Sequence, residues 1–252
     1  MAAAVALFLL APCSGGTSHS GSGAGNAKAG TLLTAVGVKE PPTARVSSTA
    51  QLQGGGAAAQ PSSAQGVFDF GANQGEFVEA IPGIGSIRIV AVGDSLYVQQ
   101  PVQVAGGQHP WLKTSRSAAP QAGPGHVGFV DPGRVSDLLR LPAHGVRKIG
   151  IEPLAGASAT HYHATLDASG SRRRVLGGIA VRSLPVDVWV DGTGLLRQFS
   201  YSLDASKLES GGGAPATGTV VYTLSLDDVG VEVVVSPPGP EELSDAVTLV
   251  RP

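Results

Sequence analysis

Apolar and polar residues alternate along most of the chain between residues 145 and 237. The pattern is clearest over residues 184–191, where apolar side chains occupy every second position: Leu184, Val186, Val188 and Val190. Successive side chains of a strand point to opposite faces of a sheet, so this period of two predicts strands with one buried and one wet face. The chain is therefore predicted to fold mainly as sheet, and the apolar faces of its strands must be covered.

A short turn, Asp191-Gly192-Thr193-Gly194, separates this strand from a second strand with the same pattern. In the second strand Phe199, Tyr201 and Leu203 alternate with polar residues. Glycine adopts a positive φ at little steric cost, and two such strands across a short loop that contains glycine form an antiparallel hairpin. The same alternation, with Gly, Pro, Asn and Asp between the segments, predicts strands at residues 45–53, 65–70, 75–81, 86–92, 96–100, 146–154, 159–167, 184–191, 195–204, 217–227 and 231–235.

Helix is predicted at two places. Residues 31–38 can form one or two turns before the Pro41-Pro42 pair, and residues 131–139 begin with Asp131 as N-cap and Pro132 at the first helical position. Residues 103–128 are predicted to be an irregular connection rich in Gly, Pro and Ser. Strands and helices do not alternate, which excludes a doubly wound fold. The predicted fold class is α+β and mainly β, a large curled antiparallel sheet covered by one or a few short helices.

The N-terminus has the organisation of an export signal. Residues 2–12 form an apolar run that is too short to span a bilayer, which takes about 20 residues. Leu10-Ala11-Pro12-Cys13 resembles the lipobox of bacterial lipoproteins, in which the cysteine is acylated and becomes the mature N-terminus. We predict a signal peptide over residues 1–13, a flexible Ser/Gly-rich tether over 14–30 and one domain over 31–252. The alternative is an ordinary secretory signal in which Cys13 has no special role.

Three stretches carry a resemblance to a known family. They are the Asp131-Pro132 helix start, Gly150-Ile151-Glu152 leading to Gly156, and the strand from Pro185 to Asp191. Together they resemble the LppX/LprAFG lipoproteins of actinobacteria, which share an architecture with the LolA and LolB lipoprotein carriers. The resemblance spans about residues 45–238. It implies a half-barrel sheet wrapped over helices, with an apolar cavity that accepts the acyl chains of lipids or lipoglycans.

On this resemblance we expect a cell-envelope lipoprotein, held by its lipid anchor at the outer face of the cytoplasmic membrane, with no catalytic residue and no cofactor. The candidate cavity residues come from one face of each strand and from the apolar stripe of the helix. They are Phe68, Phe70, Val135, Leu138, Leu139, Val186, Val188, Phe199, Tyr201, Tyr222 and Leu224. A one-residue error in register would exchange the two faces. A filled core is the alternative, in which case the protein would be an envelope scaffold that acts through a protein partner.

Gly93-Asp94-Ser95-Leu96 matches the nucleophile block of the GDSL esterases and follows a predicted strand. A serine nucleophile needs a histidine base, which that family places near its C-terminus, and this chain has no histidine after His163. Tyr97 also continues a strand-like pattern where the esterase would begin a helix. We therefore predict that Gly93-Asp94 is a hairpin turn and that the protein is not an enzyme.

His161 and His163 share one face of a predicted strand, which would permit two nitrogen ligands to one metal. The sequence shows no further His or Cys cluster, and solvent-exposed positions explain the spacing equally well, so no metal site is predicted. Arg172, Arg173 and Arg174 are expected at a hairpin tip, in solvent or against anionic headgroups. The net charge of -2 offers no basic face, which argues against a nucleic-acid partner.

Overall fold

The computed structural model describes residues 30–54, 61–81, 85–99, 110–116, 122–123, 126–127, 130–169, 181–207 and 217–244. One antiparallel sheet of eleven strands dominates this part of the chain. Its strands are β1 (Thr43–Gln53), β2 (Ser62–Asp69), β3 (Gln74–Ile81), β4 (Gly85–Val92), β5 (Ser95–Gln99), β6 (Trp111–Ser115), β9 (Ala143–Leu154), β10 (Ala157–Asp167), β11 (Ser183–Asp191), β12 (Leu196–Asp204) and β13 (Thr219–Asp227).

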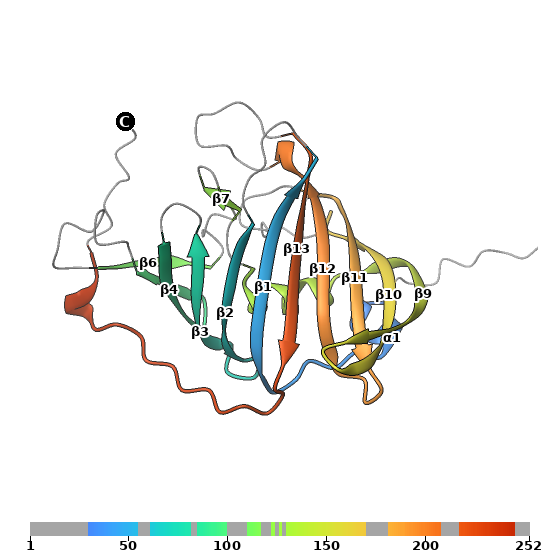
Figure 1. Ribbon diagram of the computed structural model, residues 1–252, viewed down its shortest axis with the longest axis horizontal. Coiled ribbons are helices and arrows are strands. Elements are labelled where there is room, and N and C mark those ends of the chain that lie inside the picture. Colours follow the sequence, from blue (N-terminus) through green and yellow to red (C-terminus); the bar gives the residue numbers. More distant parts are fainter. Residues whose placement is uncertain are drawn as a thin grey trace, which may run out of the picture.

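The sheet consists of two meanders that meet at its centre. The strand order is β6-β5-β4-β3-β2-β1-β13-β12-β11-β10-β9, and β1 pairs with β13 from Arg45 opposite Asp227 to Gln53 opposite Thr219. Because β6 and β9 both lie at edges, the sheet is curled but not closed (Figure 1). This is the curled antiparallel sheet that the sequence predicts.

The remaining described elements are short. They are the helices α1 (Leu32–Val36) and α3 (Pro132–Leu139), the 3-10 turns η1 (Ala205–Lys207) and η2 (Pro240–Glu242), and a separate pair of two-residue strands, β7 (Ala122–Gly123) and β8 (His126–Val127). Both α-helices lie on the same side of the sheet, behind the strands in Figure 1. We call the face of the sheet toward these helices the inner face, and the opposite face the outer face. No helix among the described residues is long and apolar enough to cross a membrane.

Helix α3 starts where the sequence predicts. The Asp131 side chain accepts a hydrogen bond from the backbone N–H of Gly133 at 3.0 Å, and Pro132 fills the first helical position. Proline is tolerated there because the first N–H groups of a helix have no partner within the helix. The helix then places Val135, Leu138 and Leu139 in the core, each at most 1% exposed.

The predicted strand faces are also confirmed. In β11 Leu184, Val186, Val188 and Val190 are buried, while the alternate positions are half-buried or exposed. The β11–β12 hairpin forms across the predicted turn, where Gly194 has a φ of 86°. Full burial of one aliphatic or aromatic side chain contributes roughly 1.5–3 kcal/mol. The inner face is therefore the main source of stability.

Two sequence predictions are wrong, both because strand pairing is not a local property. Residues 111–115, assigned to an irregular connection, form the edge strand β6 because β5 offers them a partner, with Gln99 opposite Trp111. Residues 231–235, predicted as a strand, form none, since β1 and β12 already occupy both sides of β13. This segment instead runs along one end of the sheet (Figure 1), and Leu243 then bridges to Trp111.

Candidate functional site

The eleven candidate residues lie together on the inner face and on α3. Ten of them are buried in one apolar cluster, and Phe70 is half-buried and packs against that cluster. The structure therefore confirms the face chosen for each strand and for the helix. A role for these residues in ligand binding stays a prediction.

Aromatic rings make up much of this surface. Tyr201 and Tyr222 stack with ring centroids 4.7 Å apart, and Phe68 meets Phe70 edge to face at 4.9 Å. Burial raises the pKa of both tyrosine hydroxyls well above the usual value of 10. Both phenols are thus neutral at physiological pH, which keeps this part of the inner face free of charge.

Three charged residues that sequence reasoning did not assign to the site lie at one point of the interior. Arg116, Asp131 and Arg134, which we call the inner charged cluster, are 5%, 3% and 8% exposed. Arg116 Nε lies 3.4 Å from Asp131 Oδ2, and its Cζ lies 5.5 Å from the centre of the Phe68 ring. The cluster therefore occupies the space between the start of α3 and the inner face.

The position of Arg116 depends on two turns. Its backbone N–H donates to the carbonyl of Asp94 at 2.9 Å, and its guanidinium donates to the side chain of Asn73. Asn73 has a φ of 53°, a left-handed conformation that asparagine tolerates better than most residues. A Cβ atom at position 133 would collide with both Arg116 and Asn73, so Gly133 makes this approach possible.

Arg134 differs from Arg116 because neither terminal nitrogen of its guanidinium has a hydrogen-bonding partner. Both Nη1 and Nη2 are buried and unpaired, and the charged or polar groups that influence Arg134 most are Asp131 and Tyr201. Burial lowers the pKa of Arg134. The sequence does contain a signal for this residue, since a cation in the first turn of a helix opposes the helix dipole.

Glu79 is a second charged residue on the inner face that the sequence analysis missed. It is 3% exposed, its Oε1 has no hydrogen-bonding partner, and burial raises its pKa to about 7. Glu79 stands between Phe77 and Ile81, both buried on the same face of β3. A carboxylate in an apolar register is the sequence signal that could have identified it.

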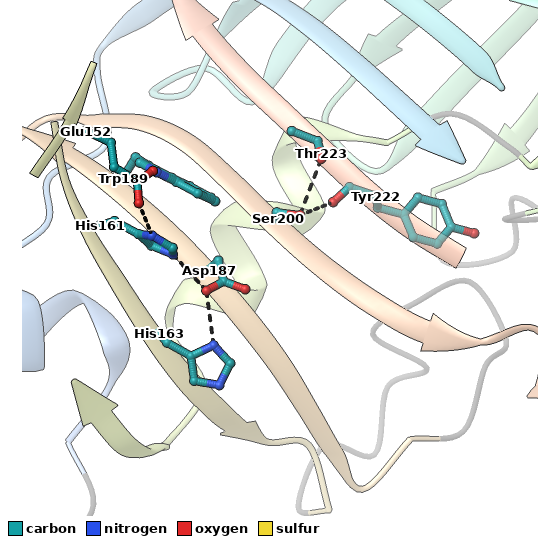
Figure 2. A network of polar contacts seen from close by, with 8 residues as sticks. All are labelled: Glu152, His161, His163, Asp187, Trp189, Ser200, Tyr222 and Thr223. Atoms are coloured by element: carbon teal, nitrogen blue, oxygen red, sulfur yellow. Dashed lines mark hydrogen bonds and ion pairs between the residues drawn. The ribbon is translucent and has the colours of Figure 1, made fainter. Parts of the chain in front are cut away.

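The two candidate metal-ligating histidines lie on the outer face, in a polar network with Glu152, Asp187 and Trp189 (Figure 2). His161 Nδ1 lies 2.8 Å from Glu152 Oε1, and His161 Nε2 lies 2.8 Å from Asp187 Oδ1. His163 Nδ1 lies 3.0 Å from the same Asp187 oxygen. Trp189 stacks on the His161 ring at 4.2 Å and donates from Nε1 to Glu152 Oε2. We call these five residues the outer polar network.

Each nitrogen of His161 faces a carboxylate, an arrangement that favours the doubly protonated imidazolium. Burial acts to lower the pKa of His161, but the hydrogen bonds to Asp187 and Glu152 outweigh it and the net pKa is raised. Hydrogen bonds from Trp189 and His161 lower the pKa of Glu152. No group of three or more His, Cys, Asp or Glu side chains in the described ranges is arranged to hold a metal ion.

The serine of the esterase-like block begins β5. Gly93 and Asp94 form the turn of the β4–β5 hairpin, as predicted, and Tyr97 continues the strand opposite Val90. Ser95 itself is the first residue of the strand and pairs with Val92. The block is therefore not followed by a helix. Cys13 and Arg172–Arg174, the other singled-out positions, lie outside the described residues.

The fold has a counterpart among solved structures. Lipoprotein LppX of Mycobacterium tuberculosis superposes with a TM-score of 0.50 at 18% identity, over 78% of this chain and 90% of LppX. The protein has the fold of LppX. LprF of Mycobacterium bovis gives a TM-score of 0.47 at 13% identity, over 82% of this chain and 93% of LprF. No model of a known protein family matches the sequence.

Two curated proteins of Streptomyces are similar in sequence. A 31.2 kDa protein of Streptomyces griseus, encoded in the rplA-rplJ intergenic region, is 26% identical over 207 residues, 72% of this chain. The Streptomyces coelicolor protein named "Putative lipoprotein SCO4650" is 28% identical over 221 residues, 81% of this chain. The similarity spans 63% of the first relative, less than two thirds of its length, and 69% of the second.

Proposed function

We propose that the protein is an envelope lipoprotein that binds an acylated lipid or lipoglycan against the inner face of its sheet. The observation that carries this proposal is the breadth of the apolar inner face, over which the described part of the chain places little helix. Eleven strands spaced about 4.8 Å apart make an arc of roughly 50 Å. The helices α1 and α3 have five and eight residues, and a helix is only about 10 Å across.

The LppX fold and the lipoprotein name of one Streptomyces relative support this proposal. In the structure ten of the candidate residues already pack against one another. An acyl chain that reaches them must therefore part α3 from the sheet, and apolar side chains of α3 must exchange contacts within the buried cluster for contacts with the lipid. The part of helix α3 beyond its start would then act as the movable side of the site.

The test is to purify the full chain from its own host, extract it with organic solvent and identify bound lipids by mass spectrometry. The wild type should carry acyl lipid in near-stoichiometric amount. Val188→Trp places a large ring on the inner face and should reduce the bound lipid several-fold. A variant on the outer face of the same strand, Asp187→Trp, is the matched control and should retain its lipid.

Close packing of the candidate residues also favours a second function, that of a scaffold with a filled core. Ile149 and Ile151 of the edge strand β9 are 47% and 65% exposed, which gives a protein partner apolar surface to contact. In a filled core Val188→Trp would cost about 1–3 kcal/mol of folding free energy by overpacking. A wild type without lipid, together with a strongly destabilised Val188→Trp variant, would support the scaffold over the lipid carrier.

The anchor is proposed at Cys13, with residues 14–30 as the tether. Cells that are fed a clickable fatty acid should label the wild type and leave Cys13→Ser unlabelled. Equal labelling of the two proteins would show that the lipid is attached elsewhere or only bound.

A further inference from the structure

The inner charged cluster has an excess of positive charge. It contains the guanidinium groups of Arg116 and Arg134 and the single carboxylate of Asp131. Oδ1 of that carboxylate accepts a hydrogen bond from the N–H of Gly133, and Oδ2 forms an ion pair, but no hydrogen bond, with Arg116 Nε at 3.4 Å. Arg134 therefore has no carboxylate of its own in the described part of the cluster.

Among the described residues, no second buried carboxylate is recorded beside Arg134. Asp137 lies one turn further along α3 and influences Arg134 electrostatically, but its side chain is exposed. The sequence from residue 117 to residue 129, which leads from β6 toward α3, contains no Asp or Glu. This stretch therefore offers Arg134 no carboxylate.

An unpaired cation in this position is energetically unfavourable. Removal of an ionised group from water without a counter-charge carries a large penalty, and arginine stays protonated at neutral pH even when burial lowers its pKa. The planar guanidinium presents parallel N–H donors that match the two oxygens of a carboxylate or phosphate. These facts are reconciled if the counter-charge of Arg134 is an anion from outside the chain.

The surroundings of Arg134 restrict what kind of anion it is. Arg134 is 8% exposed, interacts electrostatically with the buried Tyr201, and lies on the same helix as the buried Val135 and Leu138. A small free anion would have to leave water for an apolar setting. An anion attached to acyl chains brings apolar surface of its own, which the inner face can cover.

We propose that Arg134 binds the acidic head group, a carboxylate or a phosphate, of an acyl lipid whose chains lie against the inner face. This inference rests on the proposed lipid-binding function and adds the charge of the ligand to it. Arg116 and Asp131 hold the start of α3 in place beside that head group. Neutral lipids with the same chains should then bind less tightly.

The test compares matched lipids that differ only in charge. The full chain is incubated with oleate or methyl oleate, and separately with dioleoyl phosphatidate or dioleoylglycerol, and the retained lipid is quantified after gel filtration. The wild type should retain the acidic member of each pair about tenfold more than the neutral member, as expected for a charge-assisted hydrogen bond. Arg134→Gln should bring this ratio close to one without reducing retention of the neutral lipids.

Two further variants make the result specific. Arg140→Gln changes an exposed arginine at the other end of α3 and should leave the preference for acidic lipid unchanged. Arg134→Lys keeps the positive charge without the forked donors and should keep part of the preference. It replaces Arg134→Gln as the informative variant if the latter does not fold, and a full tenfold preference in Arg134→Lys would then overturn the role of the forked donors. Loss of all preference in Arg140→Gln, or a full tenfold preference in Arg134→Gln, overturns the proposal.

The outcomes separate this inference from the function on which it rests. Equal retention of acidic and neutral lipids by the wild type would overturn the role of Arg134 and leave lipid binding intact. Retention of none of the four lipids would overturn the proposed function itself. Inorganic phosphate forms a third arm: if it raises the unfolding midpoint of the wild type but not of Arg134→Gln, and no lipid shows a charge preference, the site binds a free anion and the lipid assignment is wrong.

Discussion

Two clusters of charged residues lie on opposite faces of the same sheet, and they differ in how completely they are satisfied. In the outer polar network both nitrogens of His161 face carboxylates, and the indole N–H of Trp189 donates to Glu152 (Figure 2). In the inner charged cluster Nη1 and Nη2 of Arg134 have no hydrogen-bonding partner. The outer polar network is the more exposed of the two, and water could have satisfied its hydrogen-bonding groups. Its groups nevertheless have partners within the protein.

This difference indicates that the outer polar network has a structural role and that the inner charged cluster binds a ligand. Side chains that satisfy one another on the outer face need no further partner, so the outer polar network is explained by the register of β9, β10 and β11. The inner charged cluster is more than nine-tenths buried and carries a charge that the fold does not neutralise. An unsatisfied buried cation of this kind points to a ligand, whereas a complete set of hydrogen bonds does not.

The largest effect is expected from Asp131→Asn. Asparagine caps a helix about as well as aspartate, so this change removes the charge of the inner cluster and keeps the N-cap. Two guanidinium groups would then be buried without a carboxylate, which should cost about 3–5 kcal/mol of folding free energy. Urea unfolding measures this loss of folding free energy. The matched control is Asp187→Asn in the outer polar network, which should cost about 1 kcal/mol or less. Similar losses in the two variants would remove the energetic distinction between the clusters.

A smaller and pH-dependent effect is expected at Glu79, the second unsatisfied charge of the interior. Its pKa rises from 4.5 to about 7 on folding, so the folded state holds the proton more tightly than the unfolded state. The resulting penalty is absent below pH 4.5, grows as the pH rises toward 7 and is then constant. Glu79→Gln should therefore be neutral at pH 4 and stabilise by about 3 kcal/mol at pH 8.

Glu76→Gln is the matched control for Glu79. Glu76 lies on the outer face of β3 and pairs with Arg88 at 2.6 Å. Its removal at pH 8 should cost up to about 1 kcal/mol, the opposite sign to Glu79→Gln. A Glu79→Gln variant whose stability has the same pH dependence as the wild type would show that Glu79 finds a partner in solution.

The fold was largely predictable because its signals are local. Alternation in β11, the turn before β12 and the Asp131-Pro132 helix start depend on neighbouring residues, and the structure confirms all three. The errors at β6 and at residues 231–235 arise because a segment becomes a strand only if a neighbouring strand is free to pair with it. That neighbour can lie far away in the sequence. A single sequence contains no direct record of those pairings.

The inner charged cluster escaped prediction for the same reason. Arg116 and Arg134 are separated by 18 positions and meet only because the turn at Asn73 and the end of β6 come together beside α3. Sequence alone predicted Asp131 as a cap and not as the carboxylate of a buried cluster. In the outer polar network the shared face of His161 and His163 was predictable, but their partners depend on the pairing of β10 with β9 and β11.

The smallest effect is expected from His161→Gln, and it tests whether the outer polar network is only structural. The pKa of His161 is raised in the folded state, so the stability that its charge contributes is fully present below its unfolded pKa of 6.5 and is lost as the pH rises through the folded pKa. His161→Gln should cost about 1 kcal/mol at pH 5 and clearly less at pH 9, as measured by urea unfolding. Lipid retention should be unchanged at both pH values, because the network lies on the opposite face from the candidate site. A His161→Gln variant that keeps its stability but loses bound lipid would reverse the comparison, and would assign the ligand to the outer face.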